Sequence, residues 1–448
     1  MSFFKGAMFA GNVIHTAVQN ARTKKEIRAI YSQATEANFQ NRSVSALPSA
    51  NKQQLLLISK DPNDNDIYDY QTKSPSPAFD YIWGENDDPA SMIVSGGQNE
   101  SRIGALMPFV RKSQNADISV IAMHTGNRNL ETMLGAESGN WEFISRSDLY
   151  YDMFRGMPVE DMAYLLYETM PDDSASPAAE SLIRSLLEMV LRTTGTVTFQ
   201  NLATFPLPDL KDKLETMQKA GEVTADEYRE ISRYYMSGSS EIDAVRIFLN
   251  RLNRQAEGIY GKPTANICNI KKVLNLKGIV AIDVGNTNND LVFSLIVNHL
   301  RLLQSQGRIF SMLLDDIPVS RFPQVNDLLR GVTTYAISHN DFISSLHGGE
   351  KNSEGLFIEI SGNVNTIILF NHKSGASCQK WSEHLGKYRK IRIKTTVSQT
   401  SSFFMGGNTR GISVDEVDEP RIRAETISML PGSLACINSS SGTLIAEI

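Results

Sequence analysis

The chain has 448 residues, of which 41% are hydrophobic and 21% are charged, and its net charge is −6. These values are ordinary for a soluble globular protein of two or three domains, or of one large domain with an insertion. They argue against a nucleic-acid-binding surface over the whole chain, which would be basic, and no window approaches the ~20 apolar residues of a membrane-spanning helix. The three cysteines lie far apart, so no spacing resembles a zinc site, and their odd number argues against a disulfide framework and fits a reducing compartment.

Residues 1–50 are predicted to form an N-terminal helical segment that begins with an amphipathic helix. Without a long apolar core and a cleavage site, a signal peptide is not expected here. Residues 51–90 are polar and contain one strand-like run, Gln54–Ser59. Residues 61–83 are acidic and proline-rich, which predicts a loop. A calcium-binding loop is not predicted, because the glycine and the final glutamate of that motif are absent.

The stretch Ser91–Val110, SMIVSGGQNESRIGALMPFV, has an apolar run, a glycine-rich turn and a second apolar run. This is the order of a phosphate-binding loop, G-x-x-x-x-G-K-[ST], in which a strand leads through the loop into a helix. Aligned on Gly96, which Gly97 follows, the loop has Ser101 for the second glycine, Arg102 for lysine and Ile103 for the hydroxyl residue. Backbone amides for phosphate could remain, whereas the ammonium group and the Mg²⁺-binding hydroxyl are lost. A plain strand-to-helix turn is the alternative interpretation.

Buried strands of a parallel sheet are typically continuous apolar runs. Such runs are Asp117–Met123, Gly278–Val284, Ile309–Leu314, Thr333–Ser338 and Thr366–Phe370. Apolar residues at helical spacing lie over Leu291–Gln304 and Ser377–Leu385. Strands that alternate with helices predict an α/β fold with a mostly parallel sheet flanked by helices. Lys387–Lys394, KYRKIRIK, predicts an edge strand with a solvated face rather than a nucleic-acid patch.

Residues 159–257 interrupt this α/β pattern. Their apolar residues recur at helical spacing, with proline-, glycine- and serine-rich breaks between the periodic runs. Thr224 followed by Glu227 is a capping-box pattern at the start of one run. We therefore predict an all-helical insertion domain over 159–257, and an α/β nucleotide-binding-type domain made of residues 51–158 and 258–448.

The apolar run Ile309–Leu314 ends in two acids, Asp315 and Asp316. In nucleotide hydrolases, an aspartate at such a strand end orders Mg²⁺ and a following glutamate polarises water. Acids also end buried strands simply because the chain leaves the core there. The glycine-rich turn after an earlier strand favours the nucleotide-related interpretation.

The order of these pieces resembles the TraG/TraD-type coupling proteins of conjugation and type IV secretion, within the FtsK/HerA-like motor class. The matching pieces are the acidic strand end Ile309–Pro318, the strand and helix of Gly331–Gly348 after Leu329 and Arg330, a strand pair over Ile358–Phe370, the short helix Gln379–Gly386 and the Leu-Pro-Gly element within Arg421–Cys436. The resemblance covers most of residues 85–448. It implies a RecA-like P-loop NTPase fold with an all-helical insertion.

The chain departs from the family's pattern at several catalytic positions. Ser101, Arg102 and Ile103 replace glycine, lysine and Ser/Thr, and Asp316 replaces glutamate. Ser338 stands where the family has a glutamine beside the nucleotide, a γ-phosphate sensor, and the family's membrane-spanning N-terminal helices have no counterpart. Because phosphoryl transfer depends on positioning and charge stabilisation, these combined changes predict weak or absent hydrolysis.

The resemblance leaves three hypotheses for function. The first is a catalytically degenerate component of a conjugation or type IV secretion apparatus that recruits a partner or substrate through its helical insertion. The second is an active ATP-driven DNA or protein translocase, in which Arg102 binds phosphate, Asp315 orders Mg²⁺, Asp316 activates water and Arg330 acts as a finger across a subunit interface. The third is a structural protein that merely shares the fold.

The first hypothesis carries further expectations. No resident metal or certain cofactor is expected, and weak binding of ATP and Mg²⁺ is left open. Expected partners are proteins of the secretion or conjugation machinery, including an active homologous ATPase, with DNA or protein as cargo and a homo-oligomer as one arrangement. The expected location is the cytoplasm, peripheral to the inner face of the membrane through these partners.

Overall fold

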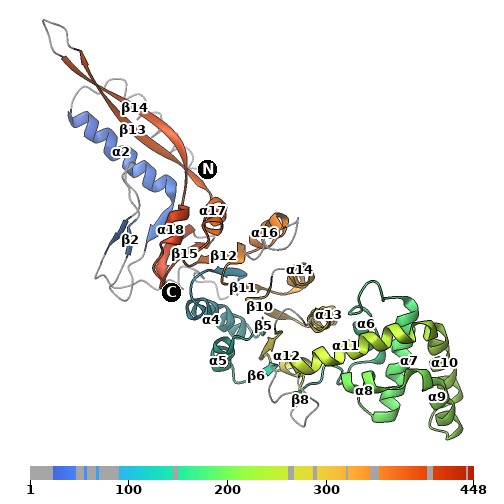
Figure 1. Ribbon diagram of the computed structural model, residues 1–448. Helices are drawn as coiled ribbons and strands as arrows, with labels where there is room; N and C mark the ends of the chain where they lie inside the picture. The colour runs from blue at the N-terminus through green and yellow to red at the C-terminus, as the bar shows by residue number, and fades with distance from the viewer. Residues whose placement is uncertain are drawn as a thin grey trace. The chain divides into compact units, whose positions relative to one another are not determined.

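The computed structural model describes residues 24–46, 55–57, 67–69, 90–144, 150–260, 267–285, 290–318, 321–343, 353–400, 407–439 and 442–448 (Figure 1). The chain divides into two compact units. One contains the described residues within Met1–Asn86, Met92–Ala105 and His339–Ile448, and the other contains those within Asp87–Ser91 and Leu106–Ser338. Helix α4, Asn99–Asn115, begins in the first unit and ends in the second.

The first unit contains a five-stranded run of sheet in the order β1-β16-β15-β12-β4. These strands are β1 Val44–Ala46, β4 Met92–Ser95, β12 Thr366–Leu369, β15 Leu434–Ser439 and β16 Gly442–Glu447. Only β15 is antiparallel to its neighbours. Helices α16 Ser353–Gly362, α17 Gly375–His384 and α18 Ala424–Ser428 belong to the same unit. Strand β4 is buried along its whole length, as its run of apolar residues predicted.

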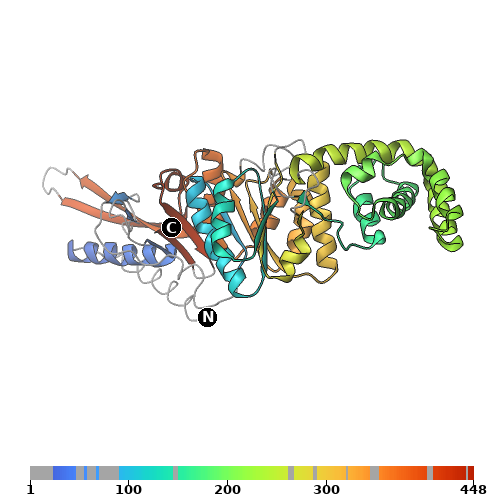
Figure 2. The same cartoon turned by 90° about the horizontal axis from the view of Figure 1, so that it is seen from below.

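A long hairpin and one helix form a second layer in the first unit. The hairpin pairs β13 Lys387–Thr400 with β14 Gly407–Pro420, and α2 Lys24–Arg42 lies along it in both views (Figure 1, Figure 2). Ile30 and Ala34 of α2 pack against Ile391 and Ile393 of β13. Alternate residues of β13 thus face α2, which explains the alternation within Lys387–Lys394.

Two features of the first unit differ from the sequence predictions. Residues 61–83 were predicted to be loop, but Ile67–Asp69 forms strand β3, which pairs with β2, Leu55–Leu57. The strand pair expected over Ile358–Phe370 contains only one strand, β12, because residues up to Gly362 belong to α16. A short run of apolar residues fits a buried strand as well as a buried helix. The sequence therefore did not show that the first part of Ile358–Phe370 is helical.

The second unit contains a fully parallel run of sheet in the order β11-β10-β5-β9-β6. Its strands are β5 Ser119–His124, β6 Trp141–Ile144, β9 Ile279–Asp283, β10 Phe310–Asp315 and β11 Tyr335–His339. The connecting helices are α5 Arg128–Glu137, α12 Ile270–Asn275, α13 Asp290–Ser305 and α14 Phe322–Gly331. Because the carboxyl ends of parallel strands meet at one edge, the polar residues that end β5, β9 and β10 come together there.

A block of helices is inserted in the second unit between the short paired strands β7 Tyr150–Tyr151 and β8 Ile267–Cys268 (Figure 1). Its helices are α6 Val159–Tyr167, α7 Pro177–Thr194, α8 Phe199–Thr204, α9 Leu210–Lys219, α10 Ala225–Gly238 and α11 Ile242–Tyr260. Two short 3₁₀ turns, Leu207–Asp209 and Ser239–Glu241, precede α9 and α11. The capping box predicted at Thr224 and Glu227 is confirmed, since each side chain bonds the backbone N–H of the other residue.

Among the described residues, no helix has both the length and the apolar character needed to cross a bilayer. The three cysteines are buried and free, in agreement with the prediction that they form no disulfide framework.

Candidate functional site: the glycine turn and the acidic strand end

The glycine turn joins β4 to α4 in the first unit. Gly96 and Gly97 both have left-handed backbone angles, with φ of 84° and 69°. Helix α4 already begins at Asn99, so the turn is short. The residues that the motif alignment placed at the end of a longer phosphate loop lie inside the helix instead.

The backbone N–H groups of both glycines have partners within the protein. The N–H of Gly96 donates to the carbonyl oxygen of His339 at 3.1 Å, and that of Gly97 donates to the carbonyl oxygen of Asn371 at 2.9 Å. A phosphate-binding loop directs such N–H groups at the anion. Here they tie the turn to His339 and to the segment that follows β12, which belong to the same unit as the turn.

The glycine turn is also closely packed. A Cβ atom at Gly96 would lie 2.6 Å from the ring of His372, and one at Gly97 would lie 2.6 Å from Cβ of Phe370. Contacts this short do not occur between real side chains, so both positions require glycine for space as well as for backbone conformation. The glycines therefore allow close approach of the neighbouring segment.

His372 is buried beside the turn and is fully hydrogen-bonded. Its Nδ1 lies 2.8 Å from the carbonyl oxygen of Phe370, and its Nε2 lies 2.9 Å from Oγ of Ser95. A carbonyl oxygen can only accept, so Nδ1 carries the hydrogen atom and Nε2 accepts from Ser95. Ser95 Oγ in turn accepts from the N–H of Phe342 at 3.3 Å. Burial lowers the pKa of His372, against the opposing effects of Phe370 and Asp341, and the neutral ring holds the end of β4.

The three altered motif residues lie at the start of α4. Arg102 is buried, and its Nη1 donates to the carbonyl oxygen of Gly97 at 3.4 Å. Ile103 belongs to the apolar core. Ser101 donates through Oγ to the carbonyl oxygen of Gly432 at 3.4 Å. The guanidinium group that replaces lysine is thus turned back onto the carbonyl oxygen of the turn itself.

The acidic strand end lies in the second unit. Asp315 ends β10, is fully buried, and accepts a 2.6 Å hydrogen bond from the side-chain amide of Asn127. It lies opposite Ser338 in the register of β10 and β11. Asp316 has a left-handed backbone with φ of 50°, and its N–H donates to the carbonyl oxygen of Ser338 at 2.9 Å. The second unit therefore brings Asp315, Asp316 and Ser338 together.

Arg330, proposed as a finger across a subunit interface, lies on α14. It is exposed and lies 3.3 Å from Asp327, one helical turn earlier.

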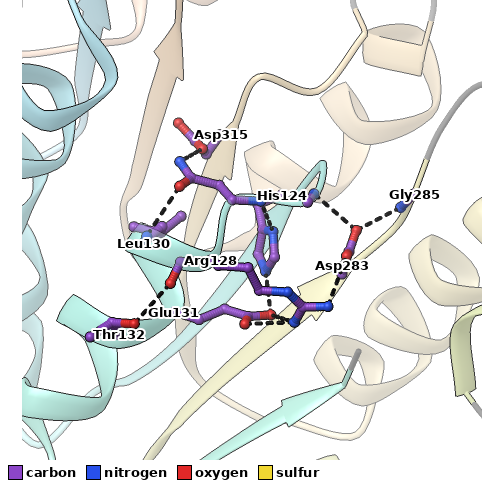
Figure 3. A network of polar contacts seen from close by, with 10 residues as sticks. His124, Arg128, Leu130, Glu131, Thr132, Asp283, Gly285 and Asp315 are labelled. Atoms are coloured by element: carbon purple, nitrogen blue, oxygen red, sulfur yellow. Dashed lines mark hydrogen bonds and ion pairs between the residues drawn. The ribbon is translucent and has the colours of Figure 1, made fainter. Parts of the chain in front are cut away.

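A polar network beside Asp315 was missed in the sequence analysis (Figure 3). The turn after β5 begins with His124, whose Nδ1 accepts from the N–H of Asn127 at 3.1 Å. A ring nitrogen that accepts carries no hydrogen atom, so the hydrogen atom is on Nε2, which lies 3.3 Å from the carboxylate of Glu131. Arg128 also binds Glu131, at 2.7 Å. Burial would raise the pKa of Glu131, but hydrogen bonds from His124 and Arg128 outweigh it and lower the pKa.

Asp283, at the end of β9, joins this network from the next strand. Its Oδ1 accepts from the N–H groups of Gly126 and Gly285, each at 3.0 Å, and its Oδ2 lies 3.9 Å from Arg128. The signal in the sequence was a polar turn, His124–Arg128, placed directly after a buried strand. The network fixes the geometry of three neighbouring strand ends, β5, β9 and β10.

Comparison with known proteins supports the fold but gives no sequence match. No protein-family model and no curated protein matches the chain. Among solved structures, the plasmid coupling protein TrwB in complex with a non-hydrolysable ATP analogue gives a TM-score of 0.50 at 14% identity, covering 82% of this chain and 87% of TrwB. Unbound TrwBdeltaN70 gives 0.48 at 13%, covering 84% and 86%. VirB4 of Thermoanaerobacter pseudethanolicus gives 0.39 at 9%, covering 80% and 88%.

The match to nucleotide-analogue-bound TrwB confirms two predictions made from the sequence. The resemblance to coupling proteins is confirmed at the level of the fold. So is the fold class, a RecA-like α/β fold with a mostly parallel sheet flanked by helices.

Proposed function

We propose that this chain is a coupling-protein-like component of a conjugation or type IV secretion apparatus that does not hydrolyse ATP and acts in recruitment of a partner or substrate. Its fold is that of TrwB, a plasmid coupling protein. The observation that carries the loss of hydrolysis is the closed glycine turn, whose Gly96 and Gly97 N–H groups bind the carbonyl oxygens of His339 and Asn371.

The chemistry of phosphoryl transfer supports the same conclusion. Catalysis by this class rests on a cationic side chain at the phosphates, a hydroxyl ligand for Mg²⁺ and an acid that positions water. Arg102 is turned onto the carbonyl oxygen of Gly97, and Ile103 in the core offers no oxygen to a metal. Losing even one preorganised electrostatic contact typically costs a factor of about 10²–10³ in rate, so losses in combination leave negligible turnover.

The helical block, α6–α11, supports the recruitment role. It exposes the large apolar side chains of Tyr164, Met236 and Ile247. The block also carries charges of both signs, among them Asp172, Asp173 and those of the segment Glu222–Glu230, which includes Arg229. Exposed apolar residues among mixed charges are typical of surfaces that bind proteins, whereas a DNA-binding surface would be predominantly basic.

Nucleotide binding provides the first test. The purified chain is titrated with ATP and with a non-hydrolysable analogue, with and without Mg²⁺, by calorimetry, and phosphate release is measured in parallel. We expect no Mg²⁺-dependent binding and no turnover. Tight Mg²⁺-dependent binding with turnover that Arg102→Ala and Asp315→Ala abolish would establish the alternative, an active translocase. Arg111→Ala, at an exposed position of α4, is the matched control.

Complementation of a transfer or secretion defect provides the second test. In cells lacking the chain, wild type and Asp315→Ala should restore transfer equally, because hydrolysis is not required. The double variant Met236→Glu and Ile247→Glu should fail, whereas Arg251→Ala, another exposed position of α11, should succeed. Failure of Asp315→Ala together with success of the double variant would reverse the proposal.

A further inference from the structure

A small cavity lies in the second unit, between the segment that follows β7, the start of α12 and one face of α13. Its volume is about 20 Å³, and it is partly enclosed. A water molecule needs roughly 10–15 Å³ by this measure, so the space accepts one small polar group. Its lining includes Met153, Arg155, Lys271, His299, Leu303 and Gln306.

His299 supplies a buried polar atom to the cavity. The residue is 3% exposed, and its Nδ1 lies 2.9 Å from the hydroxyl group of Tyr151, which is itself buried. Nε2 is then the nitrogen left for a ligand. Burial lowers the pKa of His299 to about 4, so the ring is neutral at pH 7. If Tyr151 donates to Nδ1, the hydrogen atom is on Nε2, which becomes a donor toward the cavity.

The charges around the cavity are positive. Arg155 and Lys271 line it, and no carboxylate does. Arg155 interacts electrostatically with Asp152, which does not line the cavity. Of the nearby acids, Asp161 accepts a 3.0 Å bond from Gln306. Burial raises the pKa of Asp152, although the charge of Arg155 and backbone hydrogen bonds oppose that effect, so Asp152 offsets part of the charge of Arg155.

We propose that this cavity binds the oxyanion head of a small ligand, a carboxylate or a phosphate, with one oxygen on Nε2 of His299 and the charge matched by Arg155 and Lys271. A metal cation is excluded by the two positive side chains and the absence of a lining carboxylate. The site is separate from the glycine turn, so it is independent of the function proposed above.

The test follows the ring nitrogens of the histidines by NMR in the full chain with ¹⁵N-labelled histidine. Inorganic phosphate and acetate are titrated separately, with chloride at matched ionic strength as the control. The His299 signals are assigned with His299→Gln. Lys271→Gln removes one cation from the lining, and Lys272→Gln is the matched control, because Lys272 is its exposed neighbour on α12 and does not line the cavity.

We expect a saturable shift of the His299 Nε2 signal with phosphate, acetate or both, and none with chloride. A response to phosphate alone assigns a phosphate ligand, and a response to acetate alone assigns a carboxylate. Lys271→Gln should weaken binding about tenfold, as loss of a charge-assisted contact does, and Lys272→Gln should leave it unchanged. An unmoved His299 signal, an equal response to chloride, or equal effects of the two lysine variants would overturn the proposal.

Discussion

The backbone N–H of Gly97 lies 2.9 Å from the carbonyl oxygen of Asn371, to which it donates a hydrogen bond. This bond places a carbonyl oxygen, which is a partial negative charge, where a nucleotide-binding loop presents donors to a phosphate. To bind here, a phosphate would have to break this hydrogen bond, and its negative charge would be repelled by the carbonyl oxygen. The closure of the turn thus has a stability consequence and a functional one, and the two can be measured separately.

Gly96→Ala should destabilise the chain by about 2–4 kcal/mol. Alanine would have to keep the left-handed backbone conformation of Gly96, and its Cβ would lie 2.6 Å from the ring of His372. The backbone strain and the steric overlap each cost roughly 1–3 kcal/mol. Urea unfolding followed by circular dichroism measures the loss. Gly104→Ala is the control, since nothing lies within 4 Å of its Cβ position. It should stabilise α4 by about 0.5–1 kcal/mol, and equal effects of both changes would contradict the packing described for the turn.

Glu131→Gln should lower the free energy of unfolding by about 1–3 kcal/mol. Glu131 is buried and binds both His124 and Arg128, and removing a charged partner from buried hydrogen bonds has a cost of this size. Glu137→Gln, on the same helix, removes the partner of the exposed Arg111 and should cost less than about 1 kcal/mol. Thermal unfolding compares the two variants, and a larger effect at Glu137 would disagree with the network in Figure 3.

Acid should weaken the fold because His299 is buried in its neutral form. Burial lowers its pKa from 6.5 to about 4. Between these values the unfolded chain binds a proton that the folded chain does not, so stability is complete above pH 6.5 and is lost as the pH falls toward 4. The size is about 3 kcal/mol for this one group. The pKa of His372 is shifted in the same direction.

The measurement is the free energy of unfolding between pH 7 and pH 4. His299→Gln should reduce the slope of stability against pH, whereas Gln306→Ala, a non-titrating change just after the same helix, should keep the wild-type slope. An unchanged slope in His299→Gln would show that other groups control the acid response.

Glu419→Gln should destabilise the hairpin that packs on α2. Glu419 is buried among three cations, Lys390, Arg392 and Arg423. Hydrogen bonds from Arg392 and Arg423 lower its pKa although burial opposes them, so it is a carboxylate at neutral pH. Its removal leaves cations without their shared partner and should cost about 2–4 kcal/mol.

Glu416→Gln, on the same strand, is the control for this change. Glu416 is exposed and lies 3.9 Å from an exposed Arg389, so the substitution should change stability by less than about 0.5 kcal/mol. Chemical unfolding of both variants tests the comparison, and a neutral Glu419→Gln would contradict the assigned role of the cluster.

Sequence reasoning was most accurate where a residue's environment follows from its own segment. The apolar run of β10 and the acids that end it were located within one or two residues, and Thr224 and Glu227 form the predicted capping box. It was least accurate in short apolar stretches such as Ile358–Gly362, which formed a helix, and in turns such as His124–Arg128, whose polar network it missed. Asp283, which contacts Gly126 and Arg128 of this turn, comes from a distant segment. A single sequence does not show which distant residues will meet.

The sequence by itself determined the alternation of strands and helices in the α/β part, the helical insertion and the loss of lysine and hydroxyl at Arg102 and Ile103, because these depend on local periodicity and residue type. Only the tertiary structure decided where the donors of the glycine turn point. The N–H groups of Gly96 and Gly97 bind carbonyl oxygens of His339 and Asn371, which lie far away in the chain. Hydrogen bonds between distant segments depend on how the chain packs, and local sequence patterns do not specify that packing.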